Sequence, residues 1–149
     1  MNTKPKFSLV LQTEAADPKI AFQHFTSRLS FETDVADLLI DLKKGCDHFI
    51  IVDVREAGSY KECHIPEAIS LPTNRINAET TKLFPKEKVL ITYCWGPACN
   101  GATKAAAKFS ELGFKVKELI GGIEYWRNEG GEVEGTLGKE APLYWKIQS

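Results

Sequence analysis

The chain has 149 residues, of which 43% are hydrophobic and 26% are charged, and its formal net charge is −1. This length and composition are typical of a globular domain with one core, and the absence of a basic stripe argues against a nucleic-acid partner. No apolar run approaches the roughly 18 residues of a membrane span, and the N-terminus has no signal-peptide cleavage site. We therefore expect a cytoplasmic protein without a membrane partner.

The first third of the chain predicts two helices. Residues 18–29 place apolar side chains at helical spacing behind Asp17, a typical N-cap. Residues 33–44 repeat the amphipathic pattern and stop at Gly45, a residue type that commonly ends helices. Because the first helix precedes every motif described below, we interpret residues 1–32 as a helical extension.

Strands and helices alternate in the rest of the chain. Continuous apolar runs at residues 49–54 and 89–93 are typical of strands buried on both faces of a parallel sheet. Alternation of strands and helices predicts an α/β domain with a mostly parallel sheet, in which ligands bind beyond the carboxyl ends of the strands. The other predicted elements are strands at 69–71 and 116–119 and helices at 56–63, 101–112 and 123–129.

Residues 93–104, YCWGPACNGATK, are the most informative stretch. The strand that ends at Tyr93 leads to Cys94 and a loop of small residues, and a helix is predicted to begin at Gly101. A thiol in this position faces backbone N–H groups and the positive end of a helix, which stabilise a thiolate or an anionic sulfur. The pattern predicts a reactive cysteine with a depressed pKa, and a buried cysteine without chemistry is the alternative.

The four cysteines do not predict a metal site or a disulfide framework. A cytosolic chain of this size does not need disulfides, and zinc sites usually need two closely spaced pairs. The only close pair here is Cys94 and Cys99. Cys99 is a candidate resolving thiol, with a small loop filler as the alternative. Because the two cysteines are five positions apart on one tight loop, we expect both sulfurs near the same cradle. We also expect the curl to hold the Cα atoms slightly farther apart than the roughly 7 Å of an unstrained disulfide.

Three further blocks of residues form a pattern along the chain. They are Asp53-Val54-Arg55 with Tyr60, His64-Ile65-Pro66 and residues 68–72; Tyr93-Cys94 with the following loop and helix; and Gly113-Phe114 with residues 121–126. In this order, and over about residues 33–130, the blocks resemble the signatures of rhodanese-like domains. The resemblance implies a doubly wound α/β fold and no cofactor. A tail follows at 131–149, where Leu143, Tyr144 and Trp145 are expected to pack onto the single domain.

The resemblance also implies an activity and the residues that carry it. Rhodaneses are sulfurtransferases that move sulfane sulfur through a cysteine persulfide, so Cys94 is the expected nucleophile. The expected partners are small sulfur donors and acceptors that are thiols, cyanide or a protein, and the oligomeric state is left open. Asp53, Arg55 and His64 are expected to support the site structurally. The expected substrate-binding loop consists of Trp95, Gly96, Pro97, Ala98, Cys99, Asn100 and Gly101.

The sequence departs from the common rhodanese pattern in three ways. The loop has no Arg or Lys before Lys104, so thiosulfate, a doubly charged donor, is expected to bind weakly. The loop is slightly longer than usual, as in related phosphatases, but Asn100 and Gly101 stand where those enzymes have a phosphate-clamping Arg. Cys63 and Glu67 replace glycines that are common in the first signature.

Two hypotheses from other classes stay open beside sulfur transfer. One is a thiol redox protein that uses Cys94 and Cys99, and the other is a non-catalytic rhodanese-like module that binds a partner. Loss of the cysteine usually marks such modules, and Cys94 is present.

Overall fold

The computed structural model describes residues 7–143, so the expected tail contacts of Tyr144 and Trp145 lie outside the described residues. The chain divides into two compact units, Met1–Ser30 and Phe31–Ser149, which are described separately. In the part of the chain that the structure describes, no helix has the length and hydropathy to cross a membrane.

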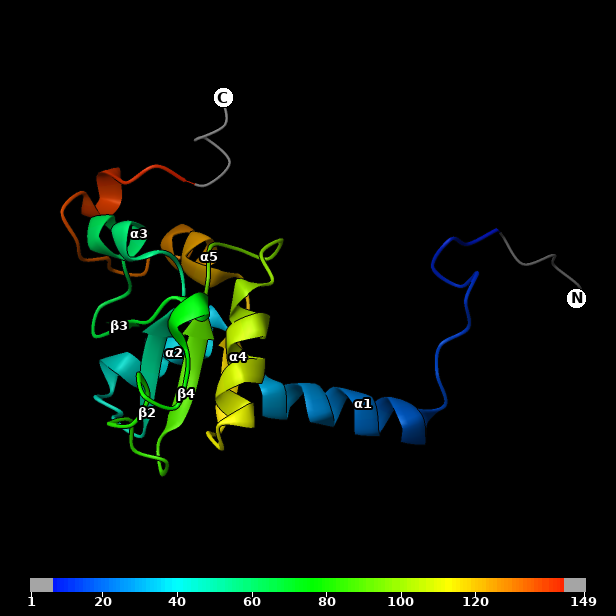
Figure 1. Cartoon of the computed structure of the whole chain (residues 1–149). Coiled ribbons are helices and arrows are strands. Elements are labelled where there is room, and N and C mark those ends of the chain that lie inside the picture. Colours follow the sequence, from blue (N-terminus) through cyan, green and yellow to red (C-terminus); the bar gives the residue numbers. More distant parts are fainter. Residues whose placement is uncertain (1–6, 144–149) are drawn as a thin grey trace, which may run out of the picture. The chain divides into compact units, whose positions relative to one another are not determined.

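The N-terminal unit contains most of helix α1 (Pro18–Phe31), which confirms the predicted N-terminal helix (Figure 1). The Asp17 carboxylate accepts a hydrogen bond of 3.0 Å from the Lys19 N–H, as expected of a residue that caps a helix. None of the residues of α1 is buried.

The second unit contains a five-stranded parallel sheet with the order β1-β5-β4-β2-β3, which confirms the predicted α/β fold (Figure 1). The central strands β2 and β4 pair in register from Phe49↔Val89 to Asp53↔Tyr93, so that their carboxyl ends are level. Their continuous apolar runs are explained by a hydrophobic cluster on each face of the sheet. The strands are β1 (Glu32–Thr33), β2 (Phe49–Asp53), β3 (Ile69–Ser70), β4 (Val89–Tyr93) and β5 (Val116–Leu119).

Helices cover both faces of this sheet. One cluster joins α2 and α5 to the sheet through residues such as Leu38 and Trp126, and the other joins α4 through Phe109. These helices lie where the sequence predicts them, with ends shifted by one or two residues. The bounds are α2 (Val35–Lys43), α3 (Ala57–Glu62), α4 (Gly101–Glu111) and α5 (Gly122–Asn128), with short 3₁₀ turns η1 (Thr73–Arg75) and η2 (Gly138–Glu140).

The start of the second predicted helix is wrong. Thr33 lies in the edge strand β1, paired with Leu119, and α2 begins only after Asp34. The Asp34 side chain accepts a hydrogen bond of 2.8 Å from the Asp37 N–H and so caps α2. A strand of two residues has no alternation that sequence periodicity can detect, and only its pairing with β5 defines it.

Candidate active site

Cys94 directly follows β4 and is only 8% exposed. Its carbonyl oxygen accepts a hydrogen bond of 3.1 Å from the Ile123 N–H, and the Trp95 carbonyl accepts one of 2.9 Å from the Glu124 N–H. Gly122 lies at this contact with φ +61°, and a Cβ there would be 2.6 Å from the Cys94 oxygen. Glycine is therefore required at position 122, and the first turn of α5 fixes the start of the loop.

The loop after Cys94 folds back so that the first turn of α4 contacts the cysteine sulfur. The Cys99 N–H donates a hydrogen bond of 3.1 Å to the Gly96 carbonyl, which closes a turn. Asn100 precedes the helix, and α4 begins at Gly101, as the sequence predicts. A Cβ on Gly101 would lie 2.8 Å from Cys94 Sγ and 3.4 Å from Cys99 Sγ. The loop thus brings Cys94, Cys99 and a helix N-terminus together.

The sulfurs of Cys94 and Cys99 are 2.6 Å apart and share a hydrogen bond, with both cysteines free. The prediction that both sulfurs lie near the same cradle is confirmed. The physical reason is twofold: the turn closed by Gly96 folds Cys99 back toward Cys94, and Gly101 has no side chain to separate the two sulfurs.

The two thiols have opposite pKa shifts. Burial, followed by the hydrogen bond and the charge of Cys99, raises the pKa of Cys94 to about 12, against a smaller opposing effect of the Trp95 N–H. Burial also acts to raise the pKa of Cys99, but the hydrogen bond from Cys94, the N–H groups of Gly101 and Trp95 and the charge of Lys104 lower it overall. With both thiols free, the pKa is raised at Cys94 and lowered at Cys99, so the prediction of a depressed pKa at Cys94 is wrong.

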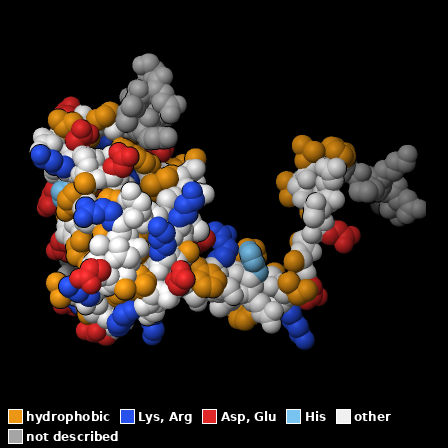
Figure 2. Space-filling view, in the orientation of Figure 1, with side chains coloured by type: hydrophobic (Ala, Val, Ile, Leu, Met, Phe, Trp, Pro, Cys, Tyr) orange, Lys and Arg blue, Asp and Glu red, His pale blue; other side chains and the backbone are white. Residues whose placement is uncertain are grey.

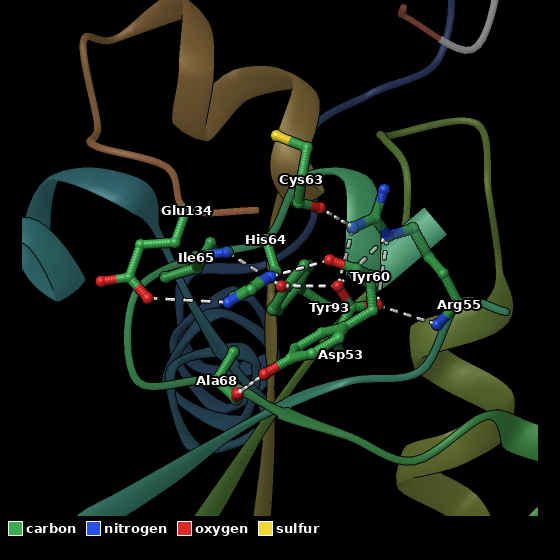
Figure 3. Close-up of polar contacts among 9 residues, drawn as sticks. All are labelled: Asp53, Arg55, Tyr60, Cys63, His64, Ile65, Ala68, Tyr93 and Glu134. Carbon is green, nitrogen blue, oxygen red and sulfur yellow. Dashed lines mark hydrogen bonds and ion pairs between the residues drawn. The ribbon is translucent and has the colours of Figure 1, made fainter. Parts of the chain in front are cut away.

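Asp53 and Arg55 form a buried ion pair beside this loop. Arg55 donates to Asp53 through Nε and through Nη2, the latter at 2.7 Å, and Nη2 also donates to the Cys63 carbonyl. Figure 3 shows these groups and the Tyr93 hydroxyl turned toward the Asp53 carboxylate. Because the pair joins the end of β2 to the Cys63 backbone, its geometry fits the structural role expected from the sequence.

Arg55 also connects this ion pair to the loop. Its guanidinium carbon lies 4.4 Å from the centre of the Trp95 ring, an arrangement in which the cation is attracted to the ring face. Trp95 packs in addition against both hydrophobic clusters of the sheet. The large ring next to Cys94 is therefore anchored and forms a wall of the site.

His64 is turned toward other partners than Cys94. Its ring stacks on Tyr60 with centroids 3.9 Å apart, Nδ1 donates to the Tyr60 carbonyl at 2.7 Å, and Nε2 lies 3.7 Å from Glu134 Oε2 (Figure 3). Tyr60 in turn donates to the Ala68 carbonyl. These contacts fit the structural role expected of His64, because one ring nitrogen faces the Tyr60 carbonyl and the other faces Glu134.

Two cavities meet at the loop. The larger, about 890 Å³, is lined by all the loop residues from Trp95 to Asn100, and the smaller, about 220 Å³, is lined by Cys94 and Cys99 together with residues of β5 and α5. Cys99 lines both cavities, whereas Cys94 lines only the smaller of these two. Molecules that enter the larger cavity therefore meet Cys99 first.

The charged residues that line the larger cavity are Arg55, Glu56 and Glu124. The Arg55 charge is offset by the ion pair with Asp53. The charges that remain at the cavity wall are therefore the negative ones of Glu56 and of Glu124, whose carboxylate lies against Gly96. On the face seen in Figure 2, acidic and basic side chains are interspersed, so no broad basic patch gathers there. The site offers little attraction to a doubly charged anion.

Sequence reasoning missed the contribution of α5 to this site. Gly122 and Glu124 were noted only as part of the closing family signature, without a role at the loop. Glu56 and Ser59, from the start of α3, line the larger cavity and were also missed. No local pattern marks these residues, because only the fold brings α3 and α5 to the carboxyl end of β4.

Comparison with known proteins agrees with this geometry. A family model for the rhodanese-like domain matches residues 35–129. Thiosulfate sulfurtransferase GlpE of Coxiella burnetii (strain RSA 331 / Henzerling II) is 37% identical over 79 residues, which cover 52% of this chain and 71% of that protein.

Solved structures show the same relationship. The crystal structure of the BH2092 protein from Bacillus halodurans is 67% identical, with a TM-score of 0.86, and the match covers 89% of this chain and 96% of that one. The solution structure of the rhodanese-like domain from the Anabaena sp Alr3790 protein is 29% identical, with a TM-score of 0.64 and coverage of 71% and 80%. Since the family model spans more than half of the sequence, this chain belongs to the family of rhodanese-like domains.

Proposed function

We propose that this protein is a rhodanese-type sulfurtransferase that carries sulfane sulfur as a persulfide on Cys94. The observation that carries the proposal is the position of Cys94 between the end of β4 and the first turn of α4, against Gly101. Backbone N–H groups at a helix start stabilise an anionic sulfur without a metal. Relatives named thiosulfate sulfurtransferase support the same class of activity.

The chemistry begins with proton transfer within the cysteine pair. Cys94 passes its proton to the Cys99 thiolate across the 2.6 Å contact and attacks the terminal sulfur of a donor. The rest of the donor molecule leaves with the electron pair of the broken bond, and Cys94 keeps the transferred sulfur as a persulfide. An acceptor thiolate, or cyanide in an assay, then attacks the outer sulfur and regenerates Cys94.

The charges of the site favour donors with little negative charge. The loop has no Arg or Lys, and the larger cavity is bordered by Glu56 and Glu124. Trp95 and Pro97 offer apolar contact to a low-molecular-weight persulfide or polysulfide. We propose such molecules as donors in preference to thiosulfate, although the curated relatives are named for thiosulfate.

The test is sulfur transfer to cyanide by wild-type protein and by the Cys94→Ser variant, combined with intact mass after donor treatment. Wild-type protein sampled directly after loading should carry one extra sulfur atom on the peptide that contains Cys94, and Cys94→Ser should lose the activity while its circular dichroism is unchanged. Cys46→Ser is the matched control, because Cys46 lies outside the site, and it should behave as wild type. Wild-type protein whose mass neither gains a sulfur atom nor falls by two hydrogens would favour the binding-module hypothesis, and full activity of Cys94→Ser would contradict the mechanism.

A further inference from the structure

We propose that Cys99 is a second catalytic cysteine, which attacks the Cys94 persulfide, releases sulfide and leaves a Cys94–Cys99 disulfide. This inference rests on the proposed function, because the persulfide on Cys94 is its substrate. It adds an activity to sulfur transfer: the protein reduces sulfane sulfur to sulfide with electrons from its own thiol pair.

The first argument is the distance between the two sulfurs. A disulfide bond is about 2.05 Å long, and the sulfurs of Cys94 and Cys99 are 2.6 Å apart while both cysteines are free. A short movement of the loop side chains therefore brings them to bonding distance. Attack within such a pair needs no encounter between molecules, so it competes well with an external acceptor.

The second argument is that the backbone is built around this pair. A Cβ on Gly101 would lie 2.8 Å from one sulfur and 3.4 Å from the other, so a side chain at this position would occupy the space beside both. The turn from Gly96 to Cys99 holds the second sulfur back toward the first. A residue that only filled the loop would not need both features.

The third argument is the environment of the Cys99 sulfur. Burial acts to raise the pKa of Cys99, whereas the hydrogen bond from Cys94, the N–H groups of Gly101 and Trp95 and the charge of Lys104 lower it. The two N–H groups and Lys104 remain in place when Cys94 carries a persulfide, and they favour the Cys99 thiolate, the form that attacks disulfides and persulfides. Because Cys99 also lines the larger cavity, a thiol that enters this cavity can reach the disulfide formed.

The step balances in atoms and electrons. Cys99, which takes the Cys94 proton during loading, first releases that proton to water. Its thiolate then attacks Sγ of Cys94, a bond forms between the two Sγ atoms, and the bond from Cys94 Sγ to the outer sulfur breaks. The outer sulfur leaves with the electron pair as hydrosulfide, so the sulfane sulfur is reduced by two electrons and the two cysteines are oxidised to a disulfide. Two equivalents of a low-molecular-weight thiol, or one dithiol, then reduce the disulfide and are themselves oxidised.

Single-turnover loading tests the proposal. Benzenethiosulfonate is the chosen donor, because it leaves as benzenesulfinate and any sulfide that appears must come from the protein persulfide. Wild-type protein without added thiol should release about one equivalent of sulfide and lose the mass of two hydrogens, with Cys94 and Cys99 linked in the peptide map. In Cys99→Ser, the gain of one sulfur atom on Cys94 should persist at least about tenfold longer.

Controls separate this inference from the proposed function. Cys46→Ser should release sulfide as wild type does, and Cys99→Ala serves if Cys99→Ser does not fold. A wild-type persulfide that lasts as long as that of Cys99→Ser overturns the resolving role, and so does sulfur found on Cys99 without sulfide release. Absence of sulfur on Cys94 in both wild type and Cys99→Ser instead overturns the proposed function on which the inference rests.

Discussion

The Tyr93 hydroxyl donates a hydrogen bond of 2.7 Å to Oδ2 of Asp53, and the two residues are register partners at the carboxyl ends of β4 and β2. The same hydroxyl accepts a hydrogen bond of 3.1 Å from the Ile65 N–H. Asp53 is fully buried and also holds Arg55. This network fixes the strand end from which Cys94 extends, since Tyr93 is the residue before Cys94.

Tyr93→Phe should lower the free energy of unfolding by about 1–3 kcal/mol, because it removes one donor from a buried carboxylate and leaves the Ile65 N–H without its acceptor. Urea denaturation followed by circular dichroism measures the change. Tyr125→Phe, at a side chain that is 43% exposed, is the control and should stay within about 0.5 kcal/mol of wild type. A loss at position 93 no larger than that of the control would contradict the structural role of the hydroxyl.

The same variant should change the alkaline stability. Burial, and then the negative charge of Asp53, raise the pKa of Tyr93 well above its ordinary value. Above about pH 10 the unfolded chain loses the Tyr93 proton while the folded protein keeps it, so the free energy of unfolding falls as pH rises. Wild type should lose up to about 1.4 kcal/mol per pH unit more than Tyr93→Phe in this window. Parallel stability curves for the two proteins above pH 10 would refute the assignment.

Gly101→Ala should retain the fold but impair the site. Alanine suits the first turn of a helix, yet its Cβ would lie 2.8 Å from Cys94 Sγ. We expect sulfur loading of Cys94 to fall about a hundredfold, because small displacements of reacting atoms are costly. The control is Gly58→Ala in α3, where an added Cβ has no atom within 4 Å. Equal loading rates for both variants would show that close contact with Gly101 is not needed.

Ala98→Arg should raise kcat/KM for thiosulfate about tenfold, since a cation at the larger cavity would offset the negative Glu56 and Glu124. Ala98→Met adds a side chain of similar length without charge and should leave thiosulfate use low. The gain should shrink at high salt, because screening weakens exposed charges. Wild-type protein that already saturates at low thiosulfate, independent of salt, would show that the proposed donor preference is wrong.

Glu67→Gly should stabilise the protein by about 0.5–1 kcal/mol, because Glu67 has φ 69°, a left-handed conformation that favours glycine. This finding explains why glycine is common at the position in the family signature. Glu67→Gln, which removes the charge but keeps the backbone cost, is the control and should change thermal stability little. Should Glu67→Gln prove as stabilising as Glu67→Gly, charge rather than conformation would account for the effect.

The sequence by itself determined the parallel sheet and the position of Cys94 between the end of β4 and the loop before α4. The apolar runs of β2 and β4 indicate strands that are buried on both faces, and the small residues after Cys94 indicate a tight loop before α4. Both features can be predicted because each depends on residues that are neighbours in the sequence. Cys63 and Glu67 illustrate the limit of such patterns: both replace glycines, but only Glu67 has a left-handed backbone, whereas Cys63 is extended with φ −161°.

Only the tertiary structure decided the contact between the Cys94 and Cys99 sulfurs and the opposite directions of their pKa shifts. That contact depends on the path of the loop, which the hydrogen bonds from Ile123 and Glu124 hold in place. Periodicity carries no information on such distances, because α5 follows the loop only after another helix and strand. The pKa values depend in turn on burial and on backbone N–H groups within reach of each sulfur, which exist only when the chain is folded.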